Sequence, residues 1–251
     1  GILTGCNEAF IIDKAKRDEL IKKDAKSVEI IRPILRGRDI ERYKSNFADL
    51  YLINTHNGIP NKNIPPIDIK NYPVVKEHLD KYWEKIKNRD DQGVTPYNLR
   101  SCAYMDEFYK QKLLWAETMR IHKSDIKNFP RFSLTDEDFF IDKTCFFAVG
   151  ENLFFLLSYL NSPIGRYIFK RYVSILDNGG YLMQKVYLEP IPIANPSSNK
   201  IKEIEKYCKI ILEGINKSIE IELNRNLYAL FDFTQEEIKF IENDNLEELS
   251  R

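Results

Sequence analysis

The chain of 251 residues carries 38 basic and 38 acidic side chains and is 43% hydrophobic. This composition is typical of one large folded domain or two modest ones with a buried core. It contains no apolar run near the roughly 20 residues that a membrane helix needs. The first residues lack the basic and long apolar regions of a signal peptide. The four cysteines form no CxxC pair and lie far from the three histidines, so neither disulfide nor zinc spacing is visible, and reduced cytoplasmic thiols are expected.

The neutral total hides an uneven distribution of charge. Residues 232–251 contain seven acidic and two basic side chains, so this segment carries −5 and the rest of the chain carries +5. The sequence therefore permits a basic face, and net charge alone does not exclude nucleic acid as a partner.

Short apolar runs separated by polar breaks make up the first fifty residues. The runs FIID, EIIRPIL and LYLIN have the β-branched and aromatic content of strands. Residues 55–73 hold one glycine and four prolines and are expected to form an ordered loop. Pro73 suits the start of a helix that continues through VVKEHLDKYWEKIKNR. Its predicted apolar face contains Val75, Leu79, Tyr82, Trp83 and Ile86.

The middle of the chain predicts a sheet and two helices. LLWAET, RFSLT, DFFID and TCFFAV are candidate strands, separated by polar breaks. ENLFFLLSYL and PIGRYIFKRYV are helical and are divided at Pro163, because proline disfavours helix in the residue before it. DNGG at 177–180 predicts a sharp turn, and the proline-rich stretch at 189–196 ends this region.

The C-terminal part predicts a long helix followed by a short one. Its apolar residues step by three and four, as in a coiled-coil seam: Ile201, Ile204, Cys208, Ile211, Ile215, then Ile219 and Leu223. In FTQEEI, Thr234 and Glu237 have the spacing of a capping box that starts the terminal helix. The expected fold class is therefore α+β: a strand-rich domain with packed helices at 1–198, followed by a helical segment at 199–251.

Motifs for catalysis are weak in this sequence. There is no GxGxxG or GxxxxGKS phosphate loop. Asn195-Pro196-Ser197-Ser198 lacks the second proline and the aromatic ring that an amino-methyltransferase loop needs, so it is read as a linker. Asp49, Asp68 and Lys70 could serve a metal-dependent nuclease, although such triplets also arise by chance in so charged a chain. No catalytic or metal-binding residue is assigned.

Recognition is the remaining class of function. Four stretches combine the arginine, lysine, amide and glycine residues that DNA binding uses: TGCN at 4–7, RPILRGRDIERYK at 32–44, the stretch around residues 120–123, and DNGGYLMQK at 177–185. Each has a structural alternative, since Arg36 and Arg38 could pair with Asp39 and Glu41 on the surface. Arg166 and its basic neighbours could likewise be an ordinary solvated helix face.

The order of the motifs carries a resemblance. GILTGCNEAFIID, EIIRPILRGRDIERY, LLWAETMR, RFSLT, FFIDKTCFFAV, ENLFFLLSYLNSPIGRYIF and YLEPIPI resemble, in that order, the TaqI-like target-recognition (specificity) domain of N6-adenine DNA methyltransferases and type IIG restriction-modification enzymes. The similarity runs from Gly1 to about Pro192. Arg32 stands where lysine is common in the family.

The resemblance implies a division of labour within a larger protein of the prokaryotic cytoplasm. An upstream methyltransferase domain would bind S-adenosylmethionine and the target adenine, a fused nuclease would use Mg²⁺, and this domain would grip and read double-stranded DNA. Neither the cofactor motif nor the catalytic loop of that methyltransferase occurs here, so the chain is expected to be a specificity domain without activity of its own. The helix after Lys200 resembles the spacer helices of related specificity subunits.

The residues expected at the DNA follow from chemistry type. Arg36 and Arg38 would contact phosphates, Gly37 would allow close approach of the backbone, and Gln184 and Lys185 would read adenine and guanine edges. The full predicted set is Thr4, Asn7, Arg36, Gly37, Arg38, Lys44, Arg120, Lys123, Gly179, Gly180, Tyr181, Gln184 and Lys185. Two alternatives remain at this point: the metal-dependent nuclease, and a docking subunit that pairs with another chain through the helix at 200–224.

Overall fold

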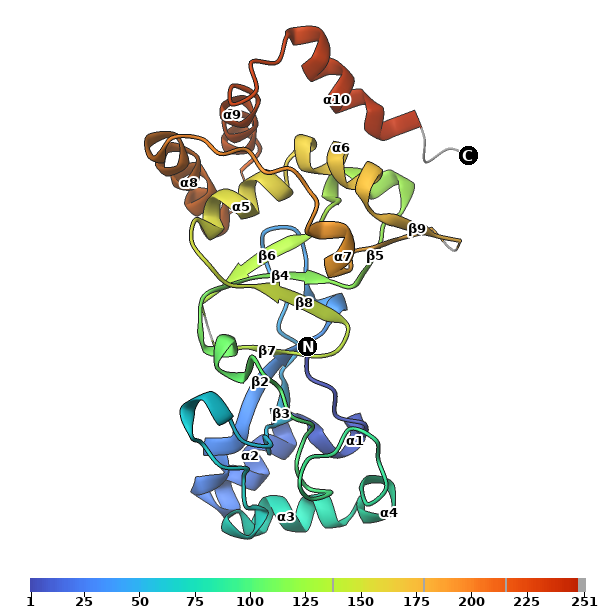
Figure 1. The fold of residues 1–251 in the computed structure, drawn as a ribbon, viewed down its shortest axis with the longest axis vertical. Coiled ribbons are helices and arrows are strands. Elements are labelled where there is room, and N and C mark those ends of the chain that lie inside the picture. Colours follow the sequence, from blue (N-terminus) through green and yellow to red (C-terminus); the bar gives the residue numbers. More distant parts are fainter. Residues whose placement is uncertain (137, 178, 215, 248–251) are drawn as a thin grey trace. The chain divides into compact units, whose positions relative to one another are not determined.

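The computed structural model describes residues 1–136, 138–177, 179–214 and 216–247 and shows an α+β fold (Figure 1). The chain forms two compact units, and each unit is assembled from separate stretches of sequence. Unit 1 contains Gly1–Arg36, Phe47–Gln111 and Asp136–Lys143; unit 2 contains Gly37–Asn46, Lys112–Thr135 and Thr144–Arg251. The predicted fold class is confirmed. The predicted division near residue 198 does not coincide with these units, because the C-terminal helices pack into unit 2.

Unit 1 is built on a four-stranded sheet in the order β1-β3-β2-β7, formed by β1 (Ile11–Asp13), β2 (Ile31–Leu35), β3 (Leu50–Ile53) and β7 (Phe140–Ile141). Neighbouring strands are antiparallel except β2 and β7, which run parallel. Ile34, Leu35, Leu52 and Phe140 are fully buried. The first three predicted strands are confirmed, and the apolar residues of IIRPIL lie in the core as expected.

Four helices accompany this sheet: α1 (Asn7–Phe10), α2 (Lys14–Lys23), α3 (Pro73–Asp80) and α4 (Trp83–Ile86). The single helix expected after Pro73 is therefore interrupted at residues 81–82. Val75, Leu79 and Ile86 are buried as predicted, whereas Trp83 is 38% exposed, so its place on the buried face was wrong. The helix restarts after Tyr82, whose φ of −106° and ψ of 13° lie outside helical geometry, and the phase of the apolar face is lost there.

Unit 2 contains two three-stranded antiparallel sheets. One has the order β6-β4-β8 and is formed by β4 (Lys112–Ala116), β6 (Phe132–Thr135) and β8 (Cys145–Ala148). The other has the order β5-β10-β9 and is formed by β5 (Thr118–Arg120), β9 (Ser174–Leu176) and β10 (Gly180–Leu182). Three of the predicted middle strands thus share one sheet, while the fourth, DFFID, supplies β7 to the sheet of unit 1.

The helices of unit 2 are α5 (Leu153–Leu160), α6 (Pro163–Tyr172), α7 (Lys185–Leu188), α8 (Ser198–Glu213), α9 (Lys217–Tyr228) and α10 (Gln235–Glu247). The predicted start of α6 is confirmed, since the Ser162 hydroxyl accepts a hydrogen bond from Gly165 N (3.1 Å) with Pro163 in the first turn. The capping box before α10 is also confirmed. Thr234 N donates to Glu237 Oε2 (2.8 Å), and Glu237 N donates to Thr234 Oγ1 (3.2 Å).

The long helix expected after Lys200 is two helices. Gly214 ends α8 with an extended backbone, and the Asn216 side chain caps α9 by accepting from Ser218 N (2.9 Å). The seam residues Ile204, Cys208 and Ile211 are at most 1% exposed and belong to the core of unit 2, together with Leu223 and Leu227. Ile215 lies outside the described residues. Within the described chain the seam packs against its own unit, which removes the basis of the docking alternative.

None of the described helices combines the length and the apolar character needed to cross a membrane. The four cysteines are free.

Candidate nucleic-acid interface

The motif IIRPILRGRDIERY places its four arginines in different surroundings. Arg32 lies at the surface of unit 1, where its guanidinium donates to the Glu29 carbonyl (2.9 Å). Arg42 stabilises unit 2, because it donates to the Asn161 carbonyl (2.8 Å) and forms an ion pair with Glu220. Arg36 is the last residue of the first segment of unit 1, Gly1–Arg36, and it interacts with other residues of the chain. Arg38 is exposed and has no side-chain partner among the described residues.

Arg38 lies at a cavity of about 370 Å³ in unit 2 that contains two further arginines. Its lining also includes Gly37, Thr118 and Leu176, and no acidic side chain among the described residues. Arg120 comes from the end of β5, and Arg131 comes from the residue before β6. The structure thus brings together Arg38 and Arg120, which the sequence predicted separately, and adds Arg131, which it did not.

The electrostatics of this cavity, the arginine pocket, favour an anionic or acceptor-rich ligand. Arg38 and Arg120 form no ion pair within the described part of the chain, and the Arg131 Nε is buried without a hydrogen-bond partner there. Arg131 is positioned by its Nη2, which donates to the Arg120 carbonyl (2.7 Å). Three guanidinium groups without carboxylate partners present fork-shaped donors that match phosphate oxygens or the O6 and N7 atoms of guanine.

The floor of the arginine pocket is one face of the β5-β10-β9 sheet. Arg120, Gly180 and Leu176 are directly opposite one another in the register of the three strands. Residues opposite each other in a ladder point to the same face. A Cβ at Gly180 would lie 3.2 Å from Thr118 Cγ2 and 3.4 Å from Arg120 Cγ, so the absence of a side chain keeps this face open.

Gly37 packs closely against neighbouring residues of its own chain. Its N–H donates to Thr144 Oγ1 (2.8 Å), and a Cβ added to it would lie 2.9 Å from the Thr144 carbonyl oxygen and 3.2 Å from Ala116 Cβ. The close approach that requires glycine is therefore to the protein's own chain. The approach of this backbone to phosphate stays a prediction.

The residues predicted to contact bases at 179–185 differ in their exposure and in their partners within the protein. Gly179 is exposed at φ +78°, which suits the turn between β9 and β10. Tyr181 is 3% exposed and its ring is stacked on Phe129 at 4.3 Å between centroids, so its side chain belongs to the core and does not fit a contact with DNA. Gln184 Nε2 donates to Glu117 Oε1 (3.0 Å), and Lys185 is exposed and pairs with Glu189 at 3.2 Å.

Lys44 and Lys123 were also predicted to contact DNA. Lys44 is exposed and pairs with Glu41 at 3.0 Å. Lys123 begins a 3₁₀ turn, Lys123–Asn128, and its side chain lies outside the described part of the structure. Lys44 and Lys185 each have a solvent-exposed partner that an anion could displace, because exposed pairs are worth at most about 1 kcal/mol.

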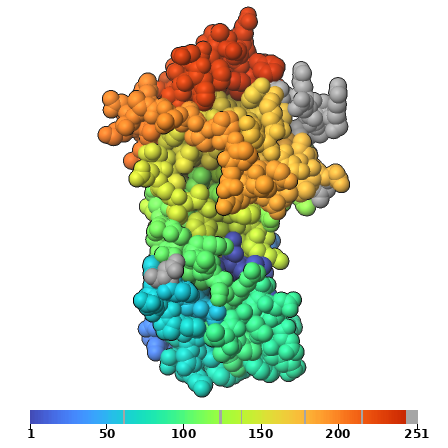
Figure 2. All heavy atoms as spheres, in the orientation of Figure 1, coloured from blue at the N-terminus to red at the C-terminus, as the bar shows by residue number. Residues whose placement is uncertain are grey.

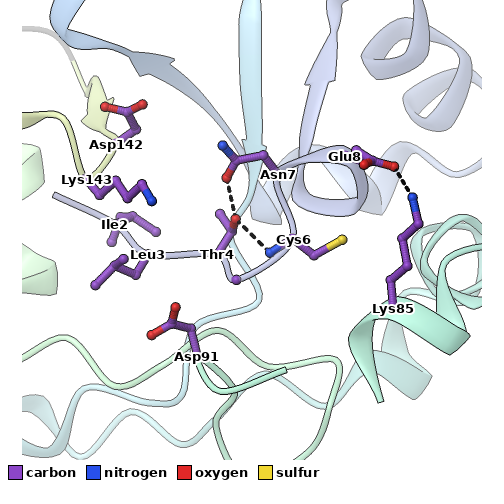
Figure 3. Close-up of a pocket in the computed structure, with 11 residues that line it drawn as sticks. Ile2, Leu3, Thr4, Cys6, Asn7, Glu8, Lys85, Asp91, Asp142 and Lys143 are labelled. Atoms are coloured by element: carbon purple, nitrogen blue, oxygen red, sulfur yellow. Dashed lines mark hydrogen bonds and ion pairs between the residues drawn. The ribbon is translucent and has the colours of Figure 1, made fainter. Parts of the chain in front are cut away.

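Thr4 and Asn7 line a second cavity, of about 480 Å³, that lies within unit 1 (Figure 3). Thr4 is 4% exposed, and its hydroxyl donates to Asn7 Oδ1 (2.6 Å). Three carboxylates and two lysines share this cavity: Glu8, Asp91, Asp142, Lys85 and Lys143. The Glu8 carboxylate pairs with Lys85 and raises the pKa of that lysine. The cavity is thus polar but not basic.

Arg89 holds the loop that carries Thr4. Its buried guanidinium donates to the carbonyls of Thr4 (2.6 Å), Pro96 (3.2 Å), Asp91 and Asn98. Burial lowers the pKa of Arg89 to about 10, so the group stays charged near neutral pH. Arg89 thus stabilises the backbone of the TGCN turn instead of facing a ligand.

The nuclease alternative finds no support in the described residues. The Asp68 carboxylate caps the backbone by accepting from Lys70 N (3.0 Å), as a structural loop residue does. Among these residues no group of three histidine, cysteine, aspartate or glutamate side chains is placed to hold a metal ion.

Comparison with known proteins identifies the family. Residues 32–193 match the TaqI-like C-terminal specificity domain, and the chain belongs to this family. The solved structure of the type IIL restriction-modification enzyme MmeI in complex with DNA has a similar fold, with a TM-score of 0.69 at 14% identity. The similarity covers all of this chain and 35% of the MmeI chain. No curated protein matches the sequence.

Proposed function

We propose that this chain reads a sequence in double-stranded DNA as the specificity module of a restriction-modification enzyme, with the arginine pocket of unit 2 at the DNA. The observation that carries the proposal is a set of three guanidinium groups that have no carboxylate partner among the described residues and meet at one cavity of a TaqI-like specificity domain. Isolated surface arginines are usually paired or solvated, whereas a convergent unpaired set favours a polyanion.

The pocket suits DNA better than a small anion. Leu176 of β9 lines the pocket, and the β9–β10 hairpin belongs to the three-stranded β5-β10-β9 sheet at one side of unit 2 (Figures 1 and 2). A two-stranded β-ribbon fits the major groove, which is about 12 Å wide. Arginines beside such a ribbon can contact the phosphates at the groove edge while the ribbon faces the bases.

The remaining activities would lie in other parts of the parent protein. The chain spans about a third of the MmeI chain. We assign adenine-N6 methylation with S-adenosylmethionine to an upstream domain, in the same chain or in a partner, and Mg²⁺-dependent cleavage to a fused nuclease where one exists. In this arrangement the chain supplies recognition without catalysis, in the cytoplasm of a prokaryote.

Selection from a random duplex pool tests the proposed function. The immobilised chain is incubated with the pool at 50 mM and 200 mM salt, and the retained duplexes are sequenced. Enrichment of one short motif at both salt concentrations is the expected result, since base contacts lose less affinity to salt than phosphate contacts do. Retention without a motif that disappears at higher salt would contradict sequence reading by this chain, and no retention at either concentration would contradict DNA binding altogether.

A further inference from the structure

The β9–β10 hairpin has one feature that the arginine pocket does not explain. Ile175, in the middle of β9, is 62% exposed, although the strand register places it opposite Tyr181, which is only 3% exposed. Tyr181 is in turn opposite Met119, which is 2% exposed. The three side chains share one face of the sheet, and of the three only Ile175, on edge strand β9, lies beyond the core.

Other residues of unit 2 cover this face of the sheet at β5 and β10, but not at Ile175 of β9. Phe129 stacks on Tyr181, and Met119 Sδ accepts a hydrogen bond from Arg131 N at 3.3 Å. Ile175 belongs to β9, one of the two edge strands of the sheet, and among the described residues β9 pairs only with β10. An exposed β-branched residue on an uncovered edge strand invites aggregation, and natural proteins usually place a charge or proline there. Ile175 is therefore an apolar side chain that a partner at this edge of the sheet can contact.

The chemistry around the hairpin defines the partner. The opposite face of the same three strands carries Arg120 and, with Arg38 and Arg131, forms the arginine pocket. A ribbon with guanidinium groups on one face and a single apolar side chain on the other fits a surface with negative charge beside an isolated apolar group. The major groove offers this combination, because phosphates form its edges and the thymine 5-methyl group is its apolar feature.

We propose that the hairpin enters the major groove with edge strand β9 foremost, and that Ile175 packs on the 5-methyl group of a thymine and thereby determines specificity at that base pair. This inference rests on the proposed function and assigns a base-reading role to Ile175 in place of Tyr181. The contact needs no movement of the core, because the side chain already stands free of it.

The test uses the thymine methyl group as the probe. Each thymine of the selected duplex is replaced in turn by deoxyuridine, which lacks only that methyl group. The wild-type chain is expected to bind about fourfold more weakly at one of these positions, the factor expected for one methyl group removed from the interface. Ile175→Ala should bind the thymine and uracil duplexes equally, whereas Ile175→Val should retain most of the difference.

Val186→Ala is the matched control, since Val186 is 64% exposed on α7 in the same unit. This variant should keep the full thymine preference, and all variants should keep the wild-type melting temperature. A thymine preference that survives in Ile175→Ala, no preference at any thymine in the wild type, or a selected motif without an A·T pair would each overturn the inference while leaving DNA recognition intact. Failure to select any motif would overturn the proposed function and the inference together.

Discussion

Two polar cavities of this chain are similar in size, but their charges differ. The cavity of unit 1, about 480 Å³, contains three carboxylates and two lysines, and one of those lysines is paired with Glu8. The arginine pocket of unit 2, about 370 Å³, contains three arginines and no acidic side chain among the described residues. A polyanion gains from the second environment and is repelled by the carboxylates of the first. The two cavities therefore differ in local charge, which the neutral net charge of the chain does not reveal.

The largest expected effect comes from removing arginines in unit 2. Arg38→Ala with Arg120→Ala should weaken DNA binding by more than about a hundredfold, because each lost hydrogen bond to a charged group is worth about 1.5–3 kcal/mol. The slope of log K against log salt should also fall by about two units, one for each phosphate contact. Fluorescence anisotropy with one labelled duplex at several salt concentrations measures both quantities.

The matched variant in unit 1 is Lys85→Ala with Lys143→Ala. Both lysines line the cavity of unit 1, and their loss should change affinity less than about threefold, since the neighbouring carboxylates disfavour phosphate there. An equal loss of affinity in the two double variants would remove the distinction between the cavities.

A smaller effect concerns the glycine beside the arginine pocket. Gly37→Ala places a Cβ 2.9 Å from the Thr144 carbonyl oxygen, and overpacking of this kind costs about 1–3 kcal/mol of unfolding free energy. Gly214→Ala is the control, because nothing lies within 4 Å of its Cβ and it should change stability by less than about 0.5 kcal/mol. Urea unfolding measures both. If Gly37→Ala instead weakened DNA binding at unchanged stability, Gly37 would serve the phosphate and not the packing.

The smallest expected effect is the pH dependence of unit 1. His78 is 5% exposed, its Nε2 lies 3.0 Å from the Ala9 carbonyl oxygen, and burial lowers its pKa below the usual value near 6.5. The unfolded chain therefore binds this proton more readily than the folded chain. The stabilisation is complete above pH 6.5 and is lost, by up to about 1.4 kcal/mol per pH unit, as pH falls toward the folded-state pKa.

Urea unfolding at pH 7.5 and 5.5 checks this dependence. His78→Gln should unfold with a weaker pH dependence than the wild type. DNA binding through the arginine pocket should stay constant over the same range, because guanidinium groups do not titrate there. An unchanged pH dependence in His78→Gln would contradict the role of buried His78.

Elements with a clear apolar period were predictable from the sequence. The strand IIRPIL, helices α5 and α6, and the capping box at Thr234 all follow from local residue chemistry. Helix α2 was missed because KAKRDELIKK has almost no apolar stripe and buries only Leu20. It is stabilised instead by the Asp13 cap and by the pairing of Glu19 with Lys23. The break at Gly214 and Asn216 was marked by residues that end and start helices, but the continuing apolar period obscured it.

The candidate site was only partly predictable, because tertiary structure decides which side chains are free. Arg38 and Arg42 are four residues apart in one motif, and long-range contacts with Asn161 and Glu220 make Arg42 structural. Tyr181 and Ile175 differ in burial because Phe129 covers one of them, and no local pattern records that stacking. Arg131 reaches the arginine pocket through its bond to the Arg120 carbonyl. Such long-range contacts leave no period in the sequence.

The most direct test of the arginine pocket is chemical protection of its arginines. The chain is treated with phenylglyoxal, which modifies accessible guanidinium groups, with and without the selected duplex, and the modified residues are quantified by mass spectrometry. We predict that DNA protects Arg38 and Arg120 and leaves Arg225, which is exposed on α9 and paired with Glu222, as reactive as before. Equal modification of Arg38 and Arg120 in the free and DNA-bound chain would contradict the assignment of DNA to this pocket.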